Sequence, residues 1–256
     1  MRLVRLLILT LGVSLCGAAA ASDLGKEQRW AEQIVDALLD GEAVYLNDGR
    51  TEFLALETES TAGDSRRAAI VMHGTGVHPN WPTVVQPLRV GLTEAGWHTL
   101  SIQMPVLPNE AEHAAYADIY DWVPGRIDAG IRHLRDQGFE TIVLIGHSQG
   151  STMAVYYLSR EPQPVEGFVA VGMSGGIAGG PMDTLAQLPA LAVPTLDLYG
   201  GEDLPEVLDS AEERAAQARK MGGDYSQQVV AGADHFFDGE EAELLEAVNA
   251  WLATRY

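Results

Sequence analysis

Short apolar runs alternate with segments of helical periodicity along most of this 256-residue chain. Strands are expected at residues 53–58, 67–73, 98–104, 141–145, 167–173, 194–199 and 225–230, and helices at 22–40, 82–95, 125–136, 149–160, 205–220 and 240–253. Strands that alternate with helices form a parallel sheet, because each helix carries the chain back across the sheet. The sequence therefore predicts an α/β fold, with a mostly parallel sheet and helices on both faces.

Ligands of such sheets bind just outside the carboxyl ends of the strands, so residues that follow each strand are the first candidates for chemistry. The run at 141–145 ends in Gly146-His147-Ser148-Gln149-Gly150, and a helical segment follows. A serine on a tight, strained strand-to-helix turn exposes its Oγ, and the turn needs small residues two positions either side. We predict that Ser148 is a nucleophile; the alternative is an ordinary structural turn.

A serine hydroxyl needs a base to accept its proton, and the base needs an acid to orient it. His235 is the only histidine after Ser148 in the chain, and it follows the last expected strand. Asp203 follows the strand at 194–199 and is the expected acid, with Glu202 as its alternative. Asp197, which lies within that strand, is a further rival. As alternatives, Asp203 could cap a helix and His235 could be an ordinary loop residue.

An acyl-transfer site also needs fixed hydrogen-bond donors for the oxyanion that forms when the serine attacks. One expected donor is the backbone N–H of Gln149, the residue after the nucleophile. The other is the N–H of Thr75, in the glycine-rich loop that follows the strand at 67–73. A plain glycine-rich turn is the alternative for that loop.

In these motifs the sequence resembles the α/β-hydrolase superfamily. The motifs are HGTG at 73–76, GHSQG at 146–150, GGED at 200–203 and ADH at 233–235. The stretches HGTGVHPNWP and LDLYGGED also resemble a group of exported bacterial proteins of that superfamily that lack an assigned function. The resemblance implies a sheet of eight strands, hydrolysis of an ester, thioester or amide, and no cofactor.

Many members of the superfamily carry a large cap after the sixth strand, but the corresponding connection here, residues 174–193, is short. We therefore expect no large cap, and the connection at 106–122 could instead form a wall of the site or occlude it. Candidate substrate-binding residues are Trp81, Met104, Tyr116, Tyr120, Trp122, Met173 and Phe236. Large apolar residues of this kind are more often part of the core.

The N-terminus has the three parts of a secretory signal peptide. Arg2 and Arg5 precede an apolar run, and small residues follow at 17–21. We expect residues 1–21 to be removed, residues 22–256 to form one α/β-hydrolase domain, and the protein to be periplasmic or secreted. The alternatives are a retained membrane anchor and, less well matched, a lipoprotein that is modified on Cys16. After cleavage no stable membrane insertion is expected.

The formal net charge is −20, and loss of the signal would make it −22. Such a charge disfavours nucleic acids and anionic membranes as partners. No H-E-x-x-H spacing, Walker loop or G-x-G-x-x-G fingerprint occurs, and His73 with His78 is only a weak zinc pattern. We therefore expect no metal and no cofactor, and a small acyl compound as the substrate.

Taken together, these patterns predict an exported serine hydrolase that cleaves an ester-type bond through Ser148, His235 and Asp203 by way of an acyl-enzyme. A carboxylesterase is favoured over a thioesterase, an amidase or an acyltransferase. The alternative from another class is a non-catalytic binding protein on the same fold. Substrate identity, acyl-chain length and oligomeric state are not predicted by the sequence.

Overall fold

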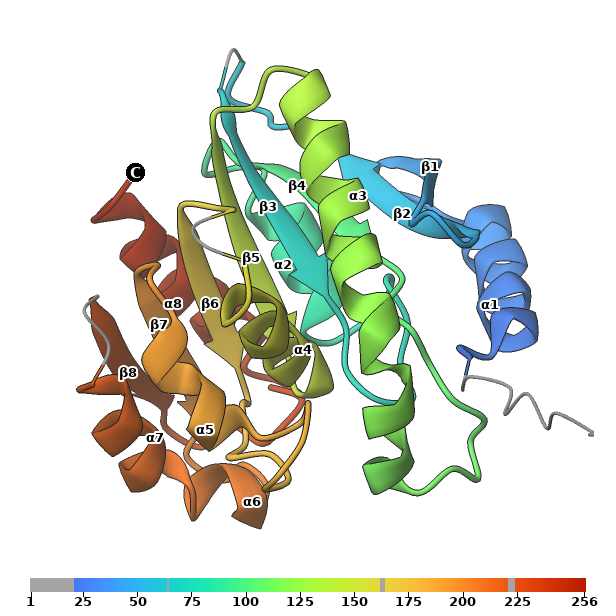
Figure 1. Cartoon of the computed structure of the whole chain (residues 1–256). Coiled ribbons are helices and arrows are strands. Elements are labelled where there is room, and N and C mark those ends of the chain that lie inside the picture. Colours follow the sequence, from blue (N-terminus) through green and yellow to red (C-terminus); the bar gives the residue numbers. More distant parts are fainter. Residues whose placement is uncertain (1–20, 64, 162–163, 221–223) are drawn as a thin grey trace, which may run out of the picture.

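The computed structural model describes residues 21–63, 65–161, 164–220 and 224–256. Its eight strands are β1 (Glu42–Asn47), β2 (Glu52–Thr58), β3 (Arg67–Met72), β4 (His98–Ile102), β5 (Thr141–His147), β6 (Gly167–Val171), β7 (Thr195–Gly200) and β8 (Tyr225–Val230). They form one sheet in the order β1-β2-β4-β3-β5-β6-β7-β8 (Figure 1). The pairs β1–β2 and β2–β4 are antiparallel, and all the other pairs are parallel. The predicted mostly parallel sheet is confirmed.

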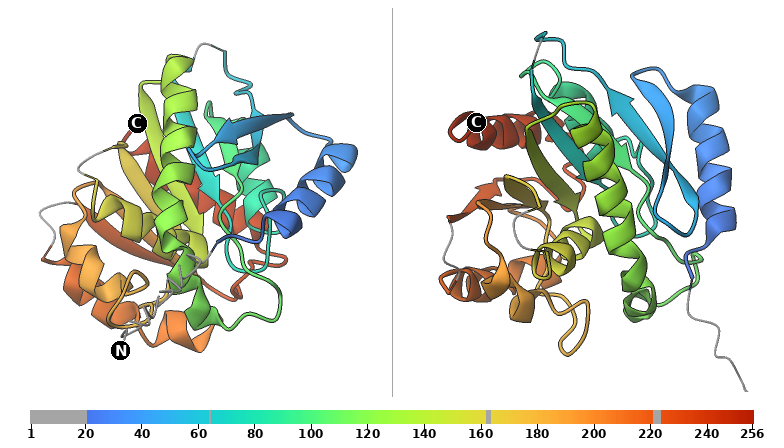
Figure 2. Two further views of the ribbon diagram at one scale, coloured as in Figure 1. Left: turned by 45° about the vertical axis from the view of Figure 1, so that its right-hand side comes forward. Right: turned by 45° about the horizontal axis from the view of Figure 1, so that its top comes forward.

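Helices cover both faces of this sheet. They are α1 (Leu24–Ala37), α2 (Val85–Gly91), α3 (Val123–Asp136), α4 (Gln149–Leu158), α5 (Thr184–Gln187), α6 (Pro205–Leu208), α7 (Ala211–Ala218) and α8 (Glu241–Ala253), with 3₁₀ helices η1 (His113–Trp122) and η2 (Leu188–Ala190). Figures 1 and 2 show α3 and α4 on one face, α2 and α8 on the opposite face, and α1 beside the β1–β2 pair.

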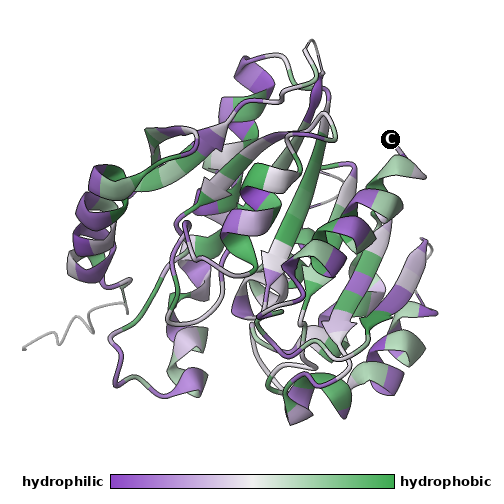
Figure 3. Ribbon diagram, turned by 180° about the vertical axis from the view of Figure 1, so that it is seen from behind, coloured by the Kyte–Doolittle hydropathy of each residue, from purple (hydrophilic) through white to green (hydrophobic). Residues whose placement is uncertain are grey.

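Each face of the sheet has its own core because successive side chains of a strand point to opposite sides. In β5, Ile142 and Leu144 join the core under α3 and α4, whereas Val143 and Ile145 join the core under α2 and α8. The central strands are therefore apolar on both sides and mostly green in Figure 3. Burial on both faces explains why these strands appear in the sequence as continuous apolar runs.

Some expected elements differ from the structure. Strand β1 was not expected, because it lies at an edge of the sheet and only Leu46 in it is buried, which leaves little apolar alternation. The helix expected at 205–220 is divided into α6 and α7. Ser210 lies between them, and its hydroxyl donates to the carbonyl of Glu206 at 2.6 Å and accepts from the N–H of Gly175 at 2.9 Å. Such bonds compete with continuation of a helix.

Two more segments differ in extent. The helix expected at 82–95 is limited to the residues of α2, and turns make up most of the remainder. The connection at 106–122 contains η1. The predicted signal peptide at 1–21 lies, except for Ala21, outside the described residues. Within the described residues, the structure has no helix with the length and apolar character needed to cross a membrane.

The register of the sheet brings the ends of its parallel strands together. Met72 at the end of β3 pairs with Gly146 in β5, and His147 at the end of β5 pairs with Val171 at the end of β6. In the same way, Gly200 at the end of β7 pairs with Val230 at the end of β8. The loops that follow β3, β5, β6, β7 and β8 therefore emerge at one edge of the sheet.

Candidate active site

Ser148 lies at the point where β5 ends and α4 begins. Its backbone has φ 54° and ψ −121°, a conformation that L-amino acids rarely adopt. Among the described residues other than glycine, it shares a positive φ only with Phe237. The N–H of Ser148 donates to the carbonyl of Val171 at 2.8 Å, which ties the turn to β6. This is the geometry of a strand-to-helix turn that presents a serine hydroxyl above the sheet.

Three glycines make this turn possible. A β-carbon on Gly146 would lie 2.7 Å from backbone atoms of Gly150, and one on Gly150 would lie 2.5 Å from the carbonyl oxygen of Met72. A β-carbon on Gly74 would lie 2.9 Å from the β-carbon of Ser148. The prediction that small residues are needed two positions either side of Ser148 is confirmed. The need for Gly74 appears only when the loop after β3 is placed.

His235 and Asp203 form a buried pair at the same edge. His235 Nδ1 lies 2.6 Å from Asp203 Oδ1, and the two residues are 7% and 4% exposed. Backbone N–H groups of Leu204 and Gly200 also donate to the Asp203 carboxylate, at 2.7 and 3.2 Å. Burial raises the pKa of this carboxyl, but the bonds and the His235 ring outweigh burial and hold the pKa below its usual value. Asp203 is therefore an ionised acceptor.

The two alternative acids, Glu202 and Asp197, are not bonded to His235. Glu202 is exposed to solvent. Asp197 is fully buried and binds Arg214, with 2.8 Å between Asp197 Oδ2 and Arg214 Nε, and its Oδ2 also accepts from Tyr225 at 2.6 Å. Of the three acids, Asp203 is thus the one bonded to His235, while Asp197 balances a buried arginine between β7 and α7.

Two further histidines form hydrogen bonds with the loops that surround the site. His147 is buried, and its Nε2 donates to the carbonyl of His235 at 2.9 Å, while their rings lie 5.0 Å apart. His73 Nδ1 donates to the carbonyl of Gly74 at 2.9 Å, and its Nε2 accepts from the N–H of Met104. Burial lowers the pKa of His147 to about 4 and that of His73 to about 3, so both rings are neutral near pH 7. The first holds the His235 loop and the second holds the loop that contains Thr75.

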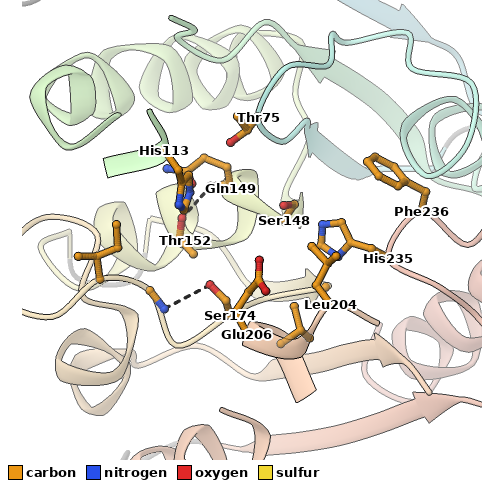
Figure 4. A pocket seen from close by; sticks show the side chains of 14 residues that line it. Thr75, His113, Ser148, Gln149, Thr152, Ser174, Leu204, Glu206, His235 and Phe236 are labelled. Atoms are coloured by element: carbon orange, nitrogen blue, oxygen red, sulfur yellow. Dashed lines mark hydrogen bonds between the residues drawn. The ribbon is translucent and has the colours of Figure 1, made fainter. Parts of the chain in front are cut away.

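The two expected oxyanion donors lie on adjacent loops beside Ser148. Gln149 is the first residue of α4, where backbone N–H groups have no acceptor within the helix. Thr75 follows β3, and Figure 4 shows its side chain at the same cavity as Ser148. The positive end of α4 adds to the attraction that this position offers to an anion.

The side chain of Gln149 belongs to a hydrogen-bonded ring. His113 Nε2 donates to Gln149 Oε1 at 2.7 Å, and Gln149 Nε2 donates to the Tyr120 hydroxyl at 2.6 Å. The Tyr120 and Thr152 hydroxyls are 2.8 Å apart, and the Thr152 hydroxyl donates to the Gln149 carbonyl at 3.0 Å. His113 and Tyr120 come from η1, so the connection at 106–122 fixes the residue next to Ser148.

A cavity of about 490 Å³ opens over these residues (Figure 4). It is lined by Thr75, His113, Ser148, Gln149, Thr152, Gly172, Ser174, Gly176, Ile177, Leu204, Glu206, Val207, His235 and Phe236. Its volume is typical of sites for small organic ligands. The expectation that the connection at 106–122 forms a wall of the site is confirmed, since His113 of this connection lines the cavity.

The predicted substrate-binding residues are mostly elsewhere. Only Phe236 lines the cavity, with 37% of its surface exposed. Met104, Tyr116 and Met173 are buried in the core under α3 and α4, as is Tyr120, and Trp122 packs against that core. Trp81 packs against the ring of His78 instead. None of these six residues lines the cavity, and five of them pack in or against the core, which is where large apolar side chains are most often found.

The cavity walls contain residues that the sequence did not single out. They include His113 from η1, Ile177 from the loop after β6, and Leu204, Glu206 and Val207 from the region of α6. The only sequence signal for the α6 group is that it follows β7. That signal does not show which side chains point inward.

Residues 16–120 and 110–254 match the family described as a protein of unknown function, DUF3530. The chain belongs to this family. The description of this family agrees with the expected resemblance to proteins that lack an assigned function.

Solved structures place this DUF3530 member among proteins with the α/β-hydrolase fold. Est1E from Butyrivibrio proteoclasticus has a TM-score of 0.67 and 15% identity, over 83% of this chain and 98% of that chain. Dienelactone hydrolase from Anabaena variabilis has a TM-score of 0.67 and 21% identity, over 84% and 97%. An alpha-beta serine hydrolase homologue from Coxiella burnetii has the same TM-score and 19% identity, over 84% and 99%. The predicted fold class is confirmed.

Among curated proteins, the chain is similar to Lipase LipV from Mycobacterium tuberculosis, with 26% identity over 168 residues. The match covers 63% of this chain and 59% of that lipase. The chain thus spans less than two thirds of the length of this relative.

Proposed function

We propose that this DUF3530 member is a serine hydrolase that cleaves ester bonds by way of an acyl-enzyme. The observation that carries the proposal is the buried His235–Asp203 pair beside a serine held at φ 54°. Because Asp203 accepts the proton of His235 Nδ1, the Nε2 of that ring is left free to accept the Ser148 proton. Figure 4 shows the His235 ring next to the Ser148 hydroxyl.

The reaction follows from these positions. Ser148 Oγ attacks the acyl carbonyl carbon while His235 Nε2 takes its proton, and Asp203 stabilises the imidazolium that forms. The N–H groups of Thr75 and Gln149 donate to the oxyanion. His235 then gives its proton to the departing alcohol oxygen, which leaves an acyl-Ser148 ester. Water, deprotonated by His235, attacks that ester and releases the acid.

The name of the lipase relative and the apolar residues of the cavity wall support an ester as the substrate over a peptide. The test is steady-state hydrolysis of uncharged esters of increasing acyl length, beside thioester and amide analogues. Ser148→Ala and His235→Gln are each expected to lower kcat by roughly four orders of magnitude or more. Equal turnover by wild type and both variants would refute the proposal.

We also propose that the protein is exported, on the basis of the signal-like residues 1–21. In a bacterial host, the protein should be recovered from the periplasm or the medium, with its N-terminus near Ser22. Recovery of the protein from the cytoplasm with residues 1–21 still attached would contradict this.

A further inference from the structure

The cavity over Ser148 is asymmetric in charge. Glu206 is the only carboxylate among its lining residues, and none of them is lysine or arginine. Glu206 lies in the first turn of α6, and Figure 4 shows its carboxylate directed into the space beside Ser148 and His235. A sphere with the volume of the cavity is about 10 Å across, close to the Debye length at physiological salt. The charge of Glu206 therefore acts on any ligand within the cavity.

This carboxylate has no partner among the residues that the structure describes. Within the described part of the chain, it forms neither a hydrogen bond nor an ion pair, although Ser210 bonds the backbone carbonyl of the same residue. Other acids nearby are neutralised or bonded: Asp203 by His235, and Asp197 by Arg214. Like Glu202, Glu206 is exposed to solvent, but it differs from Glu202 because it lines the cavity over Ser148.

An unpaired carboxylate repels the negative charge that develops on the oxyanion and so destabilises it. The oxyanion and Glu206 share one cavity, and like charges at such distances repel each other more strongly there than in bulk water. A positive charge on the substrate, placed against Glu206, would remove this repulsion and add an attraction. The acidic surface of the whole chain, with 36 acids against 16 lysines and arginines, also favours the approach of cations over anions.

We infer that Glu206 forms a subsite for a positively charged group of the substrate, an ammonium or a quaternary ammonium. The inference rests on the proposed ester hydrolysis and specifies its substrate class. Ile177, Leu204, Val207 and Phe236 supply apolar surface in the same cavity. The substrate class is therefore an ester with a short hydrocarbon portion that ends in a cationic group, and anionic esters are disfavoured.

The test compares kcat/KM for esters that differ only in charge. On the acyl side, ethyl ε-aminocaproate, ethyl heptanoate and monoethyl adipate carry a terminal cation, methyl group and anion on chains of similar length. On the alcohol side, butyrylcholine is paired with the isostere in which carbon replaces nitrogen. Each ester is measured with wild type, with Glu206→Gln, and with Glu202→Gln, which removes the same charge from a position that is also exposed but lies outside the cavity.

We expect wild type to prefer the cationic ester over its neutral isostere on at least one side by about three- to tenfold, the size of a partly screened ion pair. Glu206→Gln should abolish that preference and improve hydrolysis of monoethyl adipate, whereas Glu202→Gln should keep the wild-type ratios. High salt should weaken the preference of wild type and leave Glu206→Gln unchanged.

Hydrolysis of the neutral esters distinguishes failure of the cationic subsite from failure of the proposed hydrolase function. If wild type hydrolyses them and Glu206→Gln leaves every charge ratio unaltered, the cationic subsite is wrong and Glu206 is a solvated surface acid, while the hydrolase proposal stands. If wild type hydrolyses none of the esters, the proposed function fails and the subsite fails with it. Equal effects of Glu206→Gln and Glu202→Gln would mean that only net charge matters, which also overturns the subsite.

Discussion

The Nδ1 of His235 lies 2.6 Å from Oδ1 of Asp203, and both residues are almost fully buried. This bond places a ring proton on Nδ1 and leaves Nε2 as the unprotonated nitrogen of the neutral ring. It also separates Asp203 from Glu202, which the sequence left as alternatives. A short bond to an ionised acid in a buried position is stronger than one between neutral groups.

Replacing Asp203 with Asn should therefore remove activity without removing the serine or the base. The amide of the Asp203→Asn variant could donate to Nδ1 of His235, which would place the ring proton on Nε2. A protonated Nε2 cannot accept the proton of Ser148. We expect Asp203→Asn to lower kcat about a thousandfold or more, while Glu202→Gln keeps kcat within about twofold. Ester hydrolysis measures both, and circular dichroism checks the fold. Similar kcat values for the two variants would exclude Asp203 as the acid.

The hydrogen-bonded ring around Gln149 predicts a role for Tyr120. Tyr120→Phe removes the acceptor of the Gln149 amide, so the residue that supplies an oxyanion donor loses one restraint. We expect kcat to fall about tenfold with little change in KM. Tyr157→Phe is the matched control, because the Tyr157 hydroxyl on α4 makes a partly buried bond away from Ser148, to Asp128 at 2.6 Å. Both variants should lose about 1 kcal/mol of stability, but only Tyr120→Phe should lose kcat.

Close packing of the loop after β3 predicts that Gly74→Ala is harmful. The new methyl group would lie 2.9 Å from the Ser148 β-carbon and 3.1 Å from the His147 carbonyl oxygen. We expect a loss of about 1–3 kcal/mol in the free energy of unfolding and a large loss of activity as the loop moves. Gly180→Ala, where no atom lies within 4 Å of the added carbon, should be neutral in both assays. Urea unfolding and ester hydrolysis compare them.

Buried neutral histidines predict that the protein loses stability in mild acid. Burial lowers the pKa of His147 to about 4 and that of His73 to about 3, whereas an unfolded chain binds these protons near pH 6.5. Below pH 6.5 the unfolded state therefore binds more protons than the folded state, and stability falls as pH falls. The full contribution is present above about pH 6.5.

Each of these two histidines should lower the free energy of unfolding by about 2 kcal/mol as the pH falls from 6.5 to 5. Urea unfolding at a series of pH values measures the slope. His147→Gln should lower the stability at pH 7 but make the slope shallower. A slope as steep in His147→Gln as in wild type would show that His147 does not titrate in this way.

The sequence predicted the central strands well, because both faces of these strands are buried. Val143 on one face and Leu144 on the other are both apolar, which leaves an unbroken apolar run. The prediction failed for β1, where pairing with β2 forms the strand although only Leu46 in it is buried. It also joined α6 and α7, because the bonds of the Ser210 hydroxyl depend on where Gly175 lies. These misses depend on contacts between distant parts of the chain.

The sequence likewise predicted some residues of the candidate site and missed others. Ser148, His235 and Asp203 could be found because each lies in the segment that follows a strand and belongs to a short motif. The cavity walls could not be found in this way. His113 and Glu206 reach the cavity through the packing of η1 and α6, while the predicted Met104 and Met173 are in the core. Local sequence indicates where a strand ends but not which side chains remain uncovered above it.

The most direct test of the account is the reactivity of Ser148 itself. Protein from Ser22 onward is treated with a fluorophosphonate and weighed by intact-mass spectrometry, beside Ser148→Ala and Ser174→Ala. Ser174 lines the same cavity but is not placed beside His235 by the turn after β5. We predict one adduct on wild type and on Ser174→Ala, and none on Ser148→Ala. A folded wild type that takes no adduct, or a Ser148→Ala variant that is labelled equally, would contradict the assignment of Ser148 as the nucleophile.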